Sequence, residues 1–394
     1  MGAGRARLAE HPARARRRAG GSRVGQPGGA LPRHREPGRR VHARFNRAAA
    51  LQAAAAVAVA IEHHDAAGAL SGLLRIDAAP GAFERMQEAL DALRAASAGD
   101  VSDYLRVVDA GEASRISGIA LAHPAWFYPR GGWVDPGALA QSFLARAGSR
   151  ATLRTGRTVD ALRRSGDRWD LIDAAGALLE TADAVVLAGA GDALRLVGSP
   201  DWPVEAVRGQ LSWLALDAWP GAQPQVPVAG SGYVLPPVDG RLIFGATTTV
   251  GDSDARVRAS DHASNLRRLA VLTGVEPTRV DGIGGRTAWR SSAEDRLPLV
   301  GALPALDLLG RGKAPEAGPP PRGHRLDQPR FVPREPGLFI CSALGSRGIT
   351  WSALAAQVLA ATITGGPLPL EADLIDAIDP ARFVSRAVRR ARAG

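Results

Sequence analysis

The chain has 394 residues, of which 45% are hydrophobic and 22% are charged, proportions typical of a folded globular protein. Its formal net charge is +10, and the excess is arginine, because Lys313 is the only lysine. A basic balance of this kind favours acidic partners such as nucleic acid, although much of the excess lies in one tail and a high-GC coding sequence also enriches arginine. The single cysteine, Cys341, excludes an internal disulfide and a cysteine metal cluster, and we expect no metal site. No apolar run is long enough to span a membrane, so we expect a cytoplasmic protein.

Residues 1–40 are rich in arginine, glycine and proline and have almost no apolar periodicity. They predict a disordered leader, either sequence read from a wrong start or frame or a basic arm for nucleic-acid phosphates. The pattern changes at Arg44, from which an alanine-rich helix is predicted to run to about His64. A strand (73–76), an amphipathic helix (82–97) and the start of another helix (109–114) are predicted to follow.

Residues 123–130 (HPAWFYPR) predict an aromatic, proline-containing loop that leads into the motif GGWVDP and then into a helix over 137–147. A β-rich segment comes next, with strands predicted at 151–154, 158–163, 168–172 and 181–188. The last of these strands is apolar and ends on Gly189 and Gly191. This ending is typical of a buried parallel strand whose carboxyl end approaches a ligand, although a plain strand–loop–helix joint has the same pattern.

A second lobe is predicted to begin near Val204, with strands at 211–215, 233–235, 241–246 and 280–289 and an amphipathic helix at 260–272. Arg290 follows the last of these strands. Residues 310–335 are rich in proline and glycine and predict a loop or insertion. The final segment, 367–394, ends in a basic helix.

The segment from Gly337 to Gly366 combines an apolar strand (338–341), a glycine-bracketed loop (345–348) and a helix from about Thr350. Strand, loop and helix in this order bring unpaired backbone N–H groups to the positive end of a helix, where an anionic or electron-rich ligand can bind. Arg347 adds a positive charge at the same place. A tight turn without a ligand is an equally good interpretation of this stretch by itself.

Several segments of the chain, in order, resemble segments of the D-amino-acid-oxidase-like FAD-dependent oxidoreductases: GGWVDP, VRGQLSWL, GYVLPPVDGRLIFGATT, GRTAWRSSAEDRLPLVG and GLFICSALGSRGITWSALAAQVLA. Within this family the resemblance is greatest to the FAD-dependent half of the bifunctional enzymes that modify the wobble uridine of tRNA. The resemblance extends over roughly residues 41–375.

The resemblance implies an α/β fold of two lobes. An FAD-binding, Rossmann-like lobe, incomplete at its N-terminus, is expected from residues 41–203 and 281–375. A substrate lobe with a large mixed or antiparallel sheet is expected from residues 204–280, with a contribution from residues 98–140. Residues 376–394 are expected to form a basic tail.

The chemistry that the resemblance implies is oxidation of a secondary amine next to a carboxylate, with FAD as cofactor. In the tRNA-modifying members, the carboxymethyl group is removed from carboxymethylaminomethyl-uridine, so tRNA is the expected partner. Three residues match substrate-side positions of the family: Arg290, which would bind the carboxylate, Tyr233 and Arg347. The matching cofactor positions are Val159, Ala188, Gly189, Ala190, Gln210, Gly345, Ser346, Arg347, Gly348, Ile349 and Thr350.

Family members begin with a strand, a G-x-G-x-x-G turn and a helix that hold the FAD diphosphate, and this sequence has no such fingerprint. We therefore expect a truncated or mis-framed N-terminus, and a methyltransferase that is a separate partner or domain. Two other functions stay open: a small-molecule oxidase for amino acids, glycine or sarcosine, and an inactive flavoprotein remnant whose basic surface binds nucleic acid. The sequence leaves the oligomeric state open.

Overall fold

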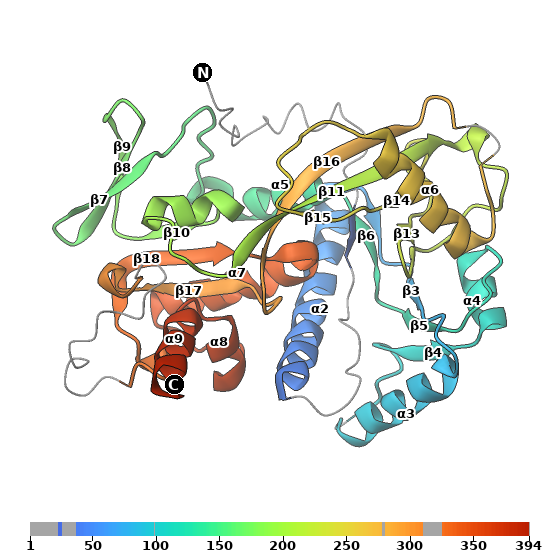
Figure 1. The fold of residues 1–394 in the computed structure, drawn as a ribbon, viewed down its shortest axis with the longest axis horizontal. Coiled ribbons are helices and arrows are strands. Elements are labelled where there is room, and N and C mark those ends of the chain that lie inside the picture. The colour runs from blue at the N-terminus through green and yellow to red at the C-terminus, as the bar shows by residue number, and fades with distance from the viewer. Residues whose placement is uncertain (1–22, 26–36, 98, 278–279, 310–324, 394) are drawn as a thin grey trace.

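The computed structural model describes residues 23–25, 37–97, 99–277, 280–309 and 325–393. It is an α/β arrangement of two lobes, and a 28-residue helix, α2 (Pro37–His64), runs between them (Figure 1). Of the expected leader, only β1 (Arg23–Gly25) and the first residues of α2 lie within the described residues.

Helix α2 packs against α7 (Gly348–Thr364), which lies near the other end of the chain. Both helices are rich in alanine, a strong helix former whose small side chain allows close approach. The indole Nε1 of Trp351 donates to Asn46 Oδ1 at 2.7 Å. The rings of Phe45 and Trp351 meet edge-on with centroids 5.5 Å apart. This contact ties the two ends of the described chain together.

The first lobe contains a three-stranded sheet in the order β10 (Val185–Leu187), β18 (Arg334–Ser342), β17 (Leu299–Pro304). Strands β10 and β18 are parallel, so their carboxyl ends lie side by side. The hydroxyl of Ser342, at the end of β18, donates to Ala190 O at 2.7 Å, beyond the end of β10. Loops leave both strands at this edge, one into the 3₁₀ helix η2 (Ala190–Val197) and one into η6 (Gly345–Arg347) and α7.

Two further sheets have three strands each. An antiparallel meander of β7 (Ala161–Ser165), β8 (Arg168–Ile172) and β9 (Leu178–Ala182) extends from the first lobe (Figure 1). The indole of Trp169 anchors it by donating to Pro336 O at 3.0 Å. The other sheet has the order β1, β6 (Gly132–Val134), β2 (Gly68–Ala69).

The second lobe is built on a nine-stranded sheet with the order β15-β11-β14-β13-β12-β3-β5-β4, in which β16 also pairs with β11. Its strands are β3 (Leu73–Ile76), β4 (Arg106–Val108), β5 (Ala125–Tyr128), β11 (Val204–Ala215), β12 (Val228–Ala229), β13 (Tyr233–Val234), β14 (Arg241–Gly245), β15 (Thr249–Val250) and β16 (Gly284–Ala293).

The two faces of this sheet are covered differently because side chains alternate along each strand. In β5, Ala125 and Phe127 pack into the core that α4 (Ala110–Ser117) and α6 (Ala259–Thr273) share. Trp126 and Tyr128 pack on the other face, with α3 (Ala82–Ala95). Helix α5 (Pro136–Ala147) follows β6, and its first turn is capped by Asp135, whose carboxylate accepts from Ala138 N at 2.7 Å.

The structure differs from the sequence-based expectation in two of these strands. Residues 125–128, expected in a loop, form β5, because their alternate side chains fill two different cores. Strand β16 pairs along its length with β11, so residues 284–293 lie in the sheet of the second lobe and not in the first lobe, to which residues from 281 on were assigned. Of the expected Pro/Gly-rich loop, residues 310–324 lie outside the described residues.

The basic C-terminal segment is anchored rather than being a free tail. It contains α8 (Ala372–Ile378) and α9 (Arg382–Ala393). Arg382 is 2% exposed, and its guanidinium donates to Asp295 Oδ2 at 2.8 Å and to the carbonyls of Leu297 and Pro298. The remaining short 3₁₀ helices are η1 (Gly148–Arg150), η3 (Leu216–Ala218), η4 (Leu306–Leu308) and η5 (Pro329–Phe331).

We predict that Asp295→Asn lowers the free energy of unfolding by about 3–5 kcal/mol, because it leaves the buried guanidinium of Arg382 without its counter-ion. Burial alone would raise the pKa of Asp295, but the hydrogen bond and charge of Arg382 hold it below its ordinary value. The carboxylate therefore stabilises the fold above about pH 4, and this contribution is lost as the pH falls through the lowered pKa. Urea unfolding at several pH values measures both effects.

The matched control is Asp376→Asn, which breaks the more exposed ion pair with Arg330. That pair is expected to contribute no more than about 1 kcal/mol. Equal losses for the two variants would contradict the role given to Arg382.

Candidate functional site

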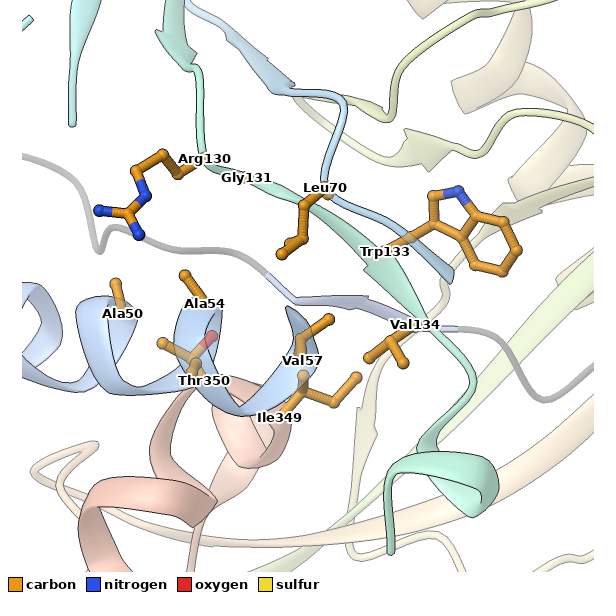
Figure 2. A pocket seen from close by; sticks show the side chains of 12 residues that line it. Ala50, Ala54, Val57, Leu70, Arg130, Gly131, Trp133, Val134, Ile349 and Thr350 are labelled. Carbon is orange, nitrogen blue, oxygen red and sulfur yellow. The ribbon is translucent and has the colours of Figure 1, made fainter. Parts of the chain in front are cut away.

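A hollow with an empty volume of about 330 Å³ lies between α2, β6 and the start of α7 (Figure 2). Figure 2 shows Arg130 at the end of the hollow that faces Ala50, and Trp133 at the other end. Its lining residues are mostly apolar: Ala50, Ala53, Ala54, Val57, Leu70, Arg130, Gly131, Gly132, Trp133, Val134, Ile349 and Thr350.

Two local sequence features open this hollow. The side chains that α2 contributes recur at helical spacing and are small, namely Ala50, Ala53, Ala54 and Val57, so this face of the helix leaves room beside it. At Gly132 a Cβ would lie 1.8 Å from Ala69 O, so only glycine lets β6 approach β2 this closely. This close pairing of β6 with β2 fixes the position of the wall of the hollow that faces α2.

Arg347 lies beside the hollow at the end of η6, and its guanidinium is largely removed from water. Its Nε is buried without a hydrogen-bond partner among the described residues, and its guanidinium lies 5.6 Å from the centre of the Trp351 ring. Burial, followed by the charges of Arg75 and Arg296, lowers the pKa of Arg347. Unscreened positive charge therefore gathers here, which favours an anionic or electron-rich ligand.

Arg290 is half-buried on β16, opposite Val207 of β11. A Cβ added to Gly209 would lie 2.7 Å from Arg290 Nη2, so the guanidinium rests directly over this glycine. Within the described part of the chain, Arg290 makes no hydrogen bond or ion pair, and burial lowers its pKa while Tyr233 raises it. A half-buried guanidinium without a partner can bind a carboxylate through two parallel hydrogen bonds.

The turn that carries Arg347 lies next to the strand that carries Arg290. Ser292 on β16 forms an isolated β-bridge with Leu344, which directly precedes η6. A Cβ added to Gly345 would lie 3.3 Å from Ser292 Oγ. The two positively charged groups singled out in the sequence therefore come from adjoining elements.

Tyr233 lies on β13, opposite Gly245 of β14. It belongs to an apolar cluster with Leu211, Leu235 and Ile243, and Trp133 packs against the same cluster. Because Trp133 also lines the hollow, it connects the hollow to the Tyr233–Arg290 side of the large sheet.

Most of the other predicted cofactor positions gather at the carboxyl edge of β10 and β18. Ala188, Gly189 and Ala190 follow β10, and the segment 345–350 follows β18. The carbonyl of Val159 accepts from Arg195 Nη2 at 2.9 Å, which ties it to η2 at the same edge. Strand ends of this kind are where open α/β sheets bind their ligands.

Gln210 differs from these positions. It is fully buried in β11, where its Oε1 accepts from Arg258 N at 2.8 Å and its Nε2 donates to Arg258 O at 2.9 Å. Both amide atoms thus hold a loop of the second lobe, which gives this side chain a structural role.

Sequence reasoning did not single out several residues of the site, chiefly Ala50, Ala54, Arg75, Arg130 and Arg296. The signal that could have found the first two is the spacing of small residues along α2. No local pattern points to Arg75 or Arg296, because only the tertiary structure brings their charges to Arg347.

The structure defines a two-lobed α/β protein whose hollow is lined in part by the first turn of the helix that follows a parallel strand, and enzymes with nucleotide cofactors commonly bind them near such strand ends. The family model for FAD dependent oxidoreductases (DAO) matches residues 13–362. The chain therefore belongs to this family, and the match begins earlier than residue 41, where the sequence motifs begin to resemble it.

Curated relatives carry the name tRNA 5-methylaminomethyl-2-thiouridine biosynthesis bifunctional protein MnmC. The protein from Methylibium petroleiphilum is 42% identical over 364 residues, covering 89% of this chain and 52% of its own length. That from Paraburkholderia phytofirmans is 38% identical over 329 residues, covering 81% of this chain and 47% of its own. The chain spans about half the length of these relatives.

Solved structures show the same fold. Glycine oxidase from Geobacillus kaustophilus has a TM-score of 0.63 at 21% identity, covering 89% of this chain and 84% of its own. Iminodiacetate oxidase from Chelativorans sp. BNC1 has a TM-score of 0.65 at 21% identity, covering 91% of each chain. Among the described residues of the present chain, no helix is long and apolar enough to cross a membrane.

FAD is the cofactor of the family, and the residues around the hollow fit its ring system. Alanines on one wall of the hollow and glycines on the other leave a narrow space that suits a flat ring. Its walls are apolar, and Ile349 and Thr350 bring the first turn of α7 to it. The buried Nε of Arg347 is a donor that the electron-rich edge of a ring would satisfy.

We predict that Arg347→Met leaves the ligand-free protein equally stable or stabilises it by about 1 kcal/mol, because the substitution removes a buried charge that nearby arginines repel. Urea unfolding of flavin-free protein measures this. The matched variant is Arg382→Met, which removes the buried arginine that Asp295 pairs with and should cost about 3–5 kcal/mol. A loss of similar size in both variants would mean that Arg347 has a stabilising partner within the protein.

Proposed function

We propose that this chain is an FAD-dependent oxidoreductase that acts on a secondary amine next to a carboxylate, and that its substrate is carboxymethylaminomethyl-uridine at the wobble position of tRNA. The observation that carries this proposal is the guanidinium of Arg290. It is half-buried, lies over Gly209, makes no hydrogen bond or ion pair in the described chain, and adjoins the turn beside the hollow.

Each residue has a defined task in this reaction. Arg290 binds the substrate carboxylate and thereby fixes the carbon between carboxylate and amine. Tyr233 lines the same place, and the charge of Arg347 with the positive end of α7 opposes negative charge that develops at the hollow. FAD, when bound, would supply the acceptor for a hydride from that carbon. Water then hydrolyses the substrate imine, which yields the aminomethyl base and glyoxylate.

Support for an RNA substrate comes from the relatives and from charge. The names of the MnmC relatives place those proteins in tRNA modification. The half-buried arginines at the site, which make no ion pair among the described residues, suit an anionic substrate. The proposal includes a cytoplasmic location and a methyltransferase activity supplied by another domain or protein.

The direct test is anaerobic flavin reduction by two substrates. With tRNA that carries carboxymethylaminomethyl-uridine, we expect bleaching of the flavin absorbance and one glyoxylate per flavin reduced. With N-methylglycine, we expect much slower reduction. Fast reduction by N-methylglycine and none by the tRNA would instead establish a small-molecule oxidase, and a colourless folded protein that takes up no FAD would overturn both assignments.

We predict that Arg290→Ala slows flavin reduction by the carboxylated amine by roughly two to three orders of magnitude while flavin stays bound. Gly209→Ala should act in the same direction, because its Cβ would displace the guanidinium of Arg290. Gly99→Ala is the matched control, since a Cβ there meets nothing within 4 Å. Stopped-flow absorbance measures the rates, and unchanged reduction by Arg290→Ala would remove this residue from the site.

A further inference from the structure

A second hollow, with an empty volume of about 260 Å³, lies beside the first, between α2 and the end of β5. The two hollows share Ala50, Ala54, Arg130 and Gly131. The second opens toward solvent, because Leu51 on its rim is 46% exposed and Arg130 is exposed as well. It lies at the Arg130 end of the first hollow, whereas Trp133 lies at the other end (Figure 2). Trp133 in turn packs against the Tyr233 cluster.

Two tyrosines line this second hollow, and neither phenol has a hydrogen-bond partner among the residues described. Tyr128 is only 2% exposed, and its ring meets that of Tyr104 edge-on with centroids 6.0 Å apart. Burial raises the pKa of Tyr104 to about 12 and raises that of Tyr128 further. Because neither hydroxyl is engaged within the described part of the chain, each can donate a hydrogen bond to a ligand in the hollow.

Two guanidiniums flank the phenols. Arg130 lines the hollow, and Arg47, one turn from Ala50 on α2, is close enough to Tyr104 for its charge to act on the phenol. Across the described ranges neither arginine makes a hydrogen bond or an ion pair. On the same helix Arg44 is paired, since its Nη2 donates to Asp373 Oδ1 at 3.1 Å. Arg44 on this helix therefore has a counter-ion, whereas Arg47 and Arg130 have none among the described residues.

Aromatic rings, phenol donors and unpaired guanidiniums around a small solvent-open hollow suit a ligand that combines a flat ring with a phosphate. A single-stranded nucleotide has both, because its base can stack on an aromatic side chain and its phosphate can take a guanidinium. A small amino acid has neither a base to stack on the aromatic ring nor a phosphate for the guanidinium. We propose that this second hollow binds a nucleotide of the substrate RNA other than the reacting uridine, with Tyr104 under its base and Arg130 on its phosphate. This inference rests on the proposed function for the identity of the RNA.

The experiment measures binding of a fluorescently labelled anticodon-loop RNA to the FAD-loaded protein by anisotropy. Tyr104→Ala and Arg130→Ala are each expected to weaken binding about tenfold. Arg130→Ala should also reduce the dependence of log Kd on log salt by about one. The matched control is Arg115→Ala on α4. Arg115 is exposed and lies on the helix that covers the opposite face of the sheet, so its loss should change Kd less than twofold.

Two further readouts decide the remaining outcomes. Tyr104→Phe keeps the ring and should retain most of the stacking, and 5-iodouridine in the anticodon loop should photo-crosslink to Tyr104. Unchanged Kd values for Tyr104→Ala and Arg130→Ala, or an equal loss in Arg115→Ala, would overturn the proposal. So would loss of bound flavin with no effect on RNA, which would assign the hollow to the cofactor. If no carboxylated amine reduces the flavin but the binding pattern holds, the proposed reaction fails while the nucleotide site stands.

Discussion

The packing of α2 against α7 is the contact on which the site depends. It joins a helix near the start of the described chain to one near its end through the Trp351–Asn46 hydrogen bond and the edge-on contact of Phe45 with Trp351. Only small side chains lie on the adjoining face of α2, so a hollow remains where α2 faces β6. Substitution of Ala54 by a larger residue would fill that space without disturbing the core contacts of Trp351.

The arginines that are at least partly buried fall into two groups, those paired with aspartates and those without a counter-ion among the described residues. Arg208, Arg334 and Arg382 are paired with aspartates, and their guanidiniums also bind backbone carbonyls. Arg290 and Arg347 are half-buried and make no ion pair with the part of the chain described. Desolvating a charge without a counter-ion costs free energy, which a bound anion offsets. The paired arginines therefore hold the fold, whereas the unpaired ones are those to which we assign binding.

In the large sheet, residues that stabilise the fold and residues that line a hollow lie on opposite faces, because side chains alternate along each strand. One face is sealed by α4 and α6 over an apolar core. Tyr128 of β5 belongs to the other face, on the side of α3, and lines the second hollow. A single strand such as β5 thus contributes both to stability and to a ligand surface, because successive side chains point in opposite directions. The site is in this way built on regular elements and not on loops alone.

The sequence by itself determined the local elements and the family. Apolar runs and glycine punctuation placed β18, α7 and the turn between them, and motifs in order placed Arg290 and Arg347 in a flavoenzyme pattern. Only the tertiary structure showed that β16 joins the second lobe and that the amide of Gln210 is hydrogen-bonded to the backbone of Arg258. It also showed that Arg75 lies close enough to Arg347 for their charges to interact. Local periodicity reports which face of an element is buried, but not what covers it. Pairing between distant strands and helices settles that, because it depends on contacts hundreds of residues apart in the chain, such as Trp351 with Asn46.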